Sequence, residues 1–99
     1  MSGGAFAVLY RWTVAAEHEA GFIERWREAT LRLRDSHGAL GSCLSRTEDG
    51  AFVAFARWPS EQARAAAFKE SGPAQPWPGI LSFEQTKLAV LEDLLTRTG

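Results

Sequence analysis

The fold of this chain is decided by residues 51–68, which read AFVAFARWPSEQARAAAF. The run that ends at Trp58 is rich in aliphatic and aromatic residues, which is typical of a buried strand. A proline then ends the strand, because it has no N–H to donate to a sheet, and the next residue, Ser60, is a favoured helix N-cap. The stretch therefore predicts a strand over residues 51–58 and a short helix over residues 60–70.

A second strand precedes this one in the sequence. Residues 39–48 have the alternation of a strand and are followed by Asp49 and Gly50. An Asp-Gly pair between two strands favours a two-residue type I′ turn, because both residue types tolerate a positive φ. We therefore expect a β-hairpin that joins residues 39–48 to residues 51–58.

The N-terminal third predicts a strand followed by a long helix. Residues 5–14 are rich in β-branched, aromatic and aliphatic residues, as strands are. Residues 17–38 carry apolar side chains four, three and four positions apart, which is the spacing of one helix face: Phe22, Trp26, Ala29 and Leu33. Gly38 is a typical end for this helix, because glycine easily adopts the left-handed conformation of a helix C-terminus.

The C-terminal third is a loop followed by an ambiguous element. Residues 71–79 hold three of the four prolines, which predicts an irregular loop. Residues 81–95 fit both the alternation of a strand and the apolar stripe of a helix. A strand through about residue 92 is the better interpretation, because the element order then becomes β-α-β-β-α-β. This order predicts an α+β, ferredoxin-like fold, in which two helices cover one face of a four-stranded antiparallel sheet.

The chain has the length of one domain, and its sheet needs a partner. We assign the domain to residues 5–99 and a disordered tail to residues 1–4. The strands that contain Leu9 and Phe55 are apolar on both faces, whereas helices cover only one face of the predicted sheet. A second copy of the same sheet would cover the other face, so we predict a homodimer with its sheet faces packed together.

Composition excludes several classes of protein. The formal net charge is -1 and the basic residues are not clustered, which argues against binding to nucleic acid or to a membrane surface. No apolar run reaches the roughly 20 residues of a membrane span, and the N-terminus lacks the basic region of a signal peptide. The single cysteine, Cys43, cannot form an internal disulfide, so we expect a cytoplasmic protein.

The aromatic residues allow two interpretations. Trp12, Trp26 and Trp58 are either core residues or the walls of a pocket that stack on a flat ligand. Tyr10, the one tyrosine of the chain, is either part of the core or a polar group in such a pocket.

The charged candidates also allow two interpretations. Arg11 and Arg57 lie in apolar strands, where a buried arginine has to be paired. Each either forms a salt bridge, across the dimer or with the glutamates of the long helix, or binds a phenolate or carboxylate of a ligand. His37 ends the long helix, either as a cap that favours the helix dipole or as a catalytic base. His18 is too far from His37 in the sequence to form a local metal motif, and we expect no metal site.

Three phrases resemble the antibiotic biosynthesis monooxygenase family: LYRWTV in the first strand, EAGFIERWRE in the first helix, and HGALGSCLSRTEDGAFVAFARWPSE across the hairpin. They cover roughly residues 7–68. The resemblance implies a dimeric α/β barrel in which each protomer has a pocket between its helices and its sheet. Some members of this family oxygenate aromatic polyketides without metal or flavin, others bind and degrade haem, and many have no assigned role.

The resemblance places the pocket tryptophan of the family at Trp58. Four residues earlier, catalytic members have an asparagine where this chain has Ala54. They also have a tyrosine near Arg64, which is absent here. Phe68 stands where the haem degraders have a histidine, and the chain contains no asparagine for their first strand.

The resemblance to this family implies a small cofactor-independent monooxygenase that acts on an aromatic, polyketide-like compound. The alternative is a non-catalytic module of the same fold that binds a small molecule or dimerises. The expected catalytic residues are Arg11 and His37. The expected substrate-binding residues are Tyr10, Trp12, Trp26, Trp58 and Phe68.

Overall fold

The structure is a computed structural model that describes residues 6–71 and 77–93. Its elements follow the order β1 (Phe6–Val14), η1 (Ala16–His18), α1 (Glu19–His37), β2 (Gly41–Arg46), β3 (Phe52–Trp58), α2 (Glu61–Ser71) and β4 (Ile80–Ala89). Apart from the short 3-10 turn η1, this is the predicted β-α-β-β-α-β order, so the α+β, ferredoxin-like fold is confirmed. The predicted tail over residues 1–4 lies outside the described residues.

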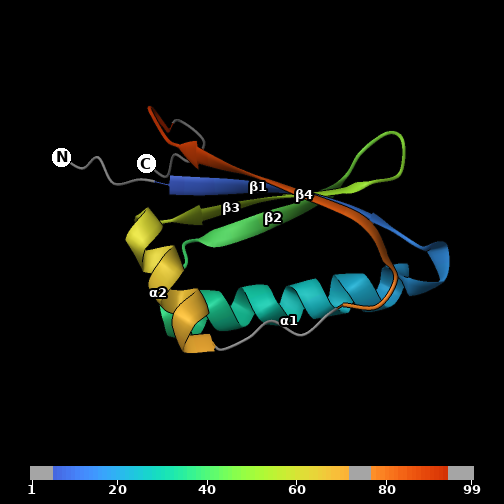
Figure 1. Ribbon diagram of the computed structural model, residues 1–99, viewed down its shortest axis with the longest axis horizontal. Helices are drawn as coiled ribbons and strands as arrows, with labels where there is room; N and C mark the ends of the chain where they lie inside the picture. The colour runs from blue at the N-terminus through green and yellow to red at the C-terminus, as the bar shows by residue number, and fades with distance from the viewer. Residues whose placement is uncertain (1–5, 72–76, 94–99) are drawn as a thin grey trace, which may run out of the picture.

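The four strands form one antiparallel sheet in the order β2-β3-β1-β4, and α1 and α2 both lie on one side of it (Figure 1). Because side chains alternate along a strand, the even-numbered residues of β1 face the helices and the odd-numbered ones face away. Tyr10 on the helix side lies between Ala54 of β3 and Gln85 of β4. On the opposite side, Leu9 pairs directly with Phe55.

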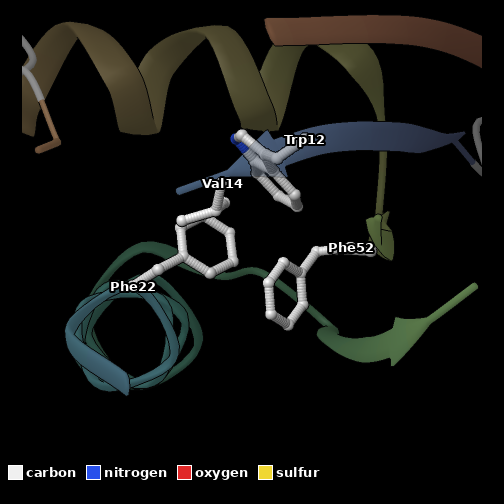
Figure 2. Close-up of a cluster of buried hydrophobic side chains, with 5 residues drawn as sticks. Trp12, Val14, Phe22 and Phe52 are labelled. Carbon is white, nitrogen blue, oxygen red and sulfur yellow. The ribbon is translucent and has the colours of Figure 1, made fainter. Parts of the chain in front are cut away.

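The core lies between the sheet and the helices and consists of two clusters of buried side chains. In the first, Phe22 of α1 packs between Trp12 of β1 and Phe52 of β3, with ring centroids 5.0 Å and 4.9 Å away (Figure 2). The second cluster contains Phe6, Val8, Trp58 and Ala67. Each large apolar side chain that is buried in this way stabilises the fold by about 1.5–3 kcal/mol.

Two of the predicted helix ends are confirmed by their hydrogen bonds and dihedral angles. The Ser60 hydroxyl oxygen accepts the N–H of Ala63 at 3.1 Å, which is the geometry of a helix N-cap. Gly38 ends α1 in the left-handed region, with a φ of 84°. The predicted C-terminal strand is present, but β4 ends at Ala89 and not at about residue 92.

The predicted two-residue type I′ turn at Asp49–Gly50 is wrong. Gly50 has a φ of 90°, but Asp49 does not have the positive φ that a type I′ turn requires at both positions. The loop is longer because Thr47 closes it: the Thr47 N–H donates to the carbonyl oxygen of Ala51 at 2.8 Å, and the Thr47 hydroxyl accepts the N–H of Ala51 at 2.9 Å. The hydrogen bond from Ala51 to the threonine hydroxyl thus takes the place of a backbone hydrogen bond that a two-residue turn would make.

Within the described residues, no helix is both long and apolar enough to cross a membrane.

Candidate functional site

A cavity of about 970 Å³ lies between the helices α1 and α2 and the helix-facing side of the sheet. This volume is at the upper end of the range for small-molecule sites, roughly 300–1,000 Å³. Its walls come from every layer of the fold: Tyr10 and Trp12 of β1, Trp58 of β3, Phe83 and Gln85 of β4, Trp26 and Leu33 of α1, and Arg64 and Phe68 of α2. Figure 1 shows the two helices on the same side of the sheet, which are the elements that provide these walls.

The sheet side of the cavity is a wall of stacked aromatic rings. The ring of Tyr10 lies 5.4 Å from that of Trp12 at 19° between planes, and 6.1 Å from that of Phe83 at 25°. The three side chains come from neighbouring positions on β1 and β4, since Trp12 pairs with Phe83 in the register. Such an aromatic wall suits an aromatic ligand, because aromatic rings prefer offset-stacked or edge-to-face contacts with one another.

Trp58 is both a core residue and a wall of the cavity. It is 2% exposed and packs in the second buried cluster, and it also makes an edge contact with Phe68 at 5.9 Å. Phe68 is 39% exposed and lies on the cavity side of α2. Trp58 therefore belongs to the core and also borders the cavity.

A polar cluster around Arg64 was missed in the sequence analysis. The guanidinium donates from Nη2 to the phenol oxygen of Tyr10 at 3.0 Å and to Oε1 of Gln85 at 3.4 Å. It also lies over the ring of Phe68, 4.6 Å from the centroid. Arg64 and Phe68 are four positions apart, so they share a helix face, and this was the one local signal that could have drawn attention to the arginine.

The charges around the cavity are mainly positive. Among the described residues, Arg25, Arg32 and Arg64 are the arginines with no carboxylate within ion-pair distance, and all three line the cavity. The lining carboxylate is Glu28. A cavity with this excess of arginine favours an anionic ligand, although the whole chain has a net charge of -1.

The structure places Arg11 and His37 away from the five aromatic candidates. Arg11 projects from the face of the sheet that the helices do not cover, where its Nη2 is 3.2 Å from Oδ2 of Asp49. His37 ends α1, with Nδ1 3.2 Å from Oε1 of Glu70. Neither residue lines the cavity. By contrast, Tyr10, Trp12, Trp26, Trp58 and Phe68 all line it.

The second strand arginine also has a partner within the chain. Arg57 forms an ion pair with Asp93, which follows β4. For both strand arginines the structure therefore shows a carboxylate partner within the chain, from the hairpin loop for Arg11 and from the segment after β4 for Arg57. Within the described ranges, no group of three or more His, Cys, Asp or Glu side chains is arranged to hold a metal ion.

Comparison with solved structures shows that the fold recurs in several proteins. The chain is similar to a variant of SnoaB, a cofactor-independent oxygenase from Streptomyces nogalater, with a TM-score of 0.75 and 18% identity over 94% of this chain and 99% of that chain. It is similar to Rv0793 from Mycobacterium tuberculosis, with a TM-score of 0.74 and 20% identity over 91% and 98% of the two chains.

A haem-degrading protein has the same fold. The chain is similar to MhuD from Mycobacterium tuberculosis, solved with two haems in its active site, with a TM-score of 0.67 and 19% identity over 90% of this chain and 98% of that chain. At these identities the likeness concerns the fold alone. The comparison with curated protein sequences gave no match.

The family itself follows from the sequence. A family model described as antibiotic biosynthesis monooxygenase matches residues 5–77, which is most of the chain. This range includes β1, both helices and the hairpin, and with them every cavity wall except the one from β4. The chain therefore belongs to the antibiotic biosynthesis monooxygenase family.

Proposed function

We propose that this protein is a small monooxygenase that oxidises an aromatic, polyketide-like compound in the cavity between its helices and its sheet, without a cofactor. The observation that carries the proposal is the wall of stacked rings formed by Tyr10, Trp12 and Phe83. Membership of the family and the shared fold with SnoaB, a cofactor-independent oxygenase, support it.

The proposed reaction needs an acidic substrate carbon and molecular oxygen. A methylene group between aromatic rings loses a proton, and the resulting carbanion is stabilised by those rings. The carbanion gives electrons to oxygen and forms a C–O bond, and the peroxide then loses water as its O–O bond breaks. The net change converts the CH₂ group and O₂ into a C=O group and H₂O. An apolar cavity favours this sequence, because it excludes competing water from the reactive anion.

A second candidate function is non-catalytic binding of a small molecule. The observation that favours it is Ala54, which is fully buried and pairs with Tyr10 across β1 and β3. The resemblance implies an asparagine at this position in catalytic members, and alanine offers no polar group. The fold alone does not decide between the two functions.

Oxygen uptake with a panel of anthrones and hydroquinones tests the first proposal against the second. We expect uptake with at least one anthrone, and a loss of about tenfold or more in kcat/KM for Phe68→Ala, because it removes a ring that borders the cavity. The matched control is Leu31→Ala. Leu31 is 41% exposed, close to the 39% of Phe68, but it lies on α1 outside the cavity lining.

Two results would count against the first proposal. Uptake that is equal in wild type and Phe68→Ala would place the reaction outside this cavity. No uptake with any compound, together with saturable quenching of tryptophan fluorescence, would support the binding module.

We also propose that two copies of the chain pack through the sheet faces that the helices leave open. The support lies at the centre of this face, where Leu9 is 38% exposed and pairs with the half-buried Phe55. Each copy would cover the other's apolar residues, and the two-fold dimer is the commonest closed arrangement.

A further inference from the structure

We propose that Arg64 and Tyr10 form an oxyanion subsite in the cavity, which binds the ligand as an ionised phenol or enol and not as the neutral compound. This proposal deepens the proposed function and rests on the same cavity. It concerns the charge of the ligand, and a binding experiment tests it without turnover.

Arg64 has hydrogen-bond donors that no described residue uses. A guanidinium has five N–H donors, and the two hydrogen bonds that it makes here both come from Nη2. The Nε–H group is buried and has no acceptor among the described residues. The two N–H groups on Nη1 are not buried and make no hydrogen bond with the described residues, so they can donate to a ligand oxygen in the cavity.

Contacts within the chain hold the Arg64 side chain in place without a ligand. Its guanidinium lies over the ring of Phe68, 4.6 Å from the centroid, and Phe68 in turn packs edge-on against the buried Trp58. Contacts from β1 and β4, through Tyr10 and Gln85, hold the other side. A fixed guanidinium loses little freedom on binding, which makes it well suited to recognise an oxyanion.

Tyr10 can donate a second hydrogen bond to a ligand beside Arg64. Because its oxygen accepts a hydrogen bond from Arg64, its own O–H proton is directed elsewhere, and no acceptor for that proton occurs among the described residues. Tyr10 also belongs to the stacked wall with Trp12 and Phe83. A flat ligand against this wall thus lies next to a tyrosine donor and an arginine donor at once.

The positive charge of Arg64 is not compensated by a described carboxylate. No carboxylate of the described residues is within ion-pair distance of Arg64, whereas Arg11, Arg27, Arg34, Arg46 and Arg57 each have one. Arg25 and Arg32 add further positive charge to the lining, and Glu28 is the one carboxylate among the described lining residues. An uncompensated arginine in a largely apolar site stabilises an anion far more than a neutral hydroxyl, because charge-assisted hydrogen bonds are about twice as strong as neutral ones.

The test compares two flat probes of nearly the same shape under anaerobic conditions: 2-hydroxyanthraquinone, which has an acidic phenol, and anthraquinone, which has none. We expect wild type to bind 2-hydroxyanthraquinone at least about tenfold more tightly than anthraquinone and to shift its absorption to that of the phenolate. Arg64→Gln removes the charge but keeps a polar side chain. We expect it to lose most of this preference and the absorption shift, with the affinity for anthraquinone unchanged.

The control is Arg27→Gln, which removes an arginine of α1 that pairs with Glu24 and lies outside the cavity lining. It should keep the preference for 2-hydroxyanthraquinone, and circular dichroism should show that both variants are folded. The proposal is overturned if Arg64→Gln keeps the preference and the shift, or if Arg27→Gln loses them equally. Because no oxygen is present, this result is independent of whether the protein turns over any substrate.

Discussion

At the scale of single residues, Trp58 shows how a side chain can serve the core and the cavity together. Its indole packs with Phe6 and Val8 in a buried cluster, and its edge meets Phe68 at the cavity. A tryptophan is large enough for both contacts. A position in the core and a position beside the cavity therefore do not exclude each other for this residue.

Asp49 carries a prediction about pH. The hydrogen bond from the Thr47 hydroxyl, helped by the Arg11 guanidinium, holds the pKa of the Asp49 carboxyl below its ordinary value of 3.8. Since the folded-state pKa is the lower one, the carboxylate contributes stability above about pH 3.8, which is lost as the pH falls through the folded-state pKa. We expect Asp49→Asn to unfold at lower urea concentration than wild type at pH 7, with a difference that disappears on acidification.

Urea unfolding at a series of pH values measures this difference, and the full exposure of the carboxylate means that it will be small and reduced by salt. Glu48→Gln is the control, because Glu48 is the exposed neighbour in the same loop and has no ion-pair partner among the described residues. A difference between Asp49→Asn and wild type that is constant from pH 7 to about pH 3 would contradict the linkage.

At the scale of the elements, most of what the sequence predicts is confirmed, and the differences lie at the ends. The helix α1 and the strands β1 and β3 follow from local periodicity, and the cap at Ser60 follows from its residue type. The hairpin turn was predicted wrongly because a side chain, that of Thr47, closes the loop with its own hydrogen bond. Dipeptide preferences do not include such a contact.

Gly79 carries a prediction at the joint between η1 and β4. It has a φ of 83°, its carbonyl oxygen accepts the N–H of Ala15 at 2.8 Å, and a Cβ added to it would overlap the side chain of His18. Gly79→Ala therefore carries two free-energy costs, one for the left-handed backbone and one for the overlap with His18. We expect it to lower the free energy of unfolding by at least about 2 kcal/mol, as measured by chemical denaturation.

The matched control for this variant is Gly50→Ala. Gly50 also has a positive φ, of 90°, but an added Cβ would meet no atom within 4 Å. It should lose only the backbone term of about 1–2 kcal/mol. Equal losses in the two variants would show that the close approach of His18 has no energetic weight.

At the scale of the whole molecule, the sheet has one face covered by helices and one face that no described helix or strand covers (Figure 1). The open face is apolar around Leu9 and Phe55, and the ion pairs of Arg11 and Arg57 lie on the strands beside them. A monomer would expose this surface to water, which costs free energy in proportion to its apolar area.

The proposed dimer predicts the effect of a charge at the centre of this face. We expect wild type to have twice the chain mass of 10.9 kDa in light scattering at micromolar concentration. Leu9→Glu should weaken the dimer by at least about tenfold, because it would place an unpaired carboxylate in an apolar interface. Leu31→Glu, on the exposed side of α1 and of similar exposure, should remain dimeric. A monomeric wild type would rule out the dimer.

The sequence by itself determined the order of the elements, the apolar face of α1 and the aromatic character of the candidate site. These properties are local, since the period of apolar residues and the caps and breakers lie within a few positions of each other. The cavity walls at Tyr10, Trp12, Trp26, Trp58 and Phe68 were found for the same reason, because large aromatic residues on buried faces are recognisable without any coordinates.

Only the tertiary structure decided where the charges lie. Arg11 was expected in the site and lies on the opposite face of the sheet, whereas Arg64 was not expected and lies in the cavity. The partners of Arg64 are 54 and 21 positions away in the sequence, on two different strands. Which arginine finds a carboxylate and which is left for a ligand depends on the packing of α2 against the sheet, and no local pattern encodes that distance.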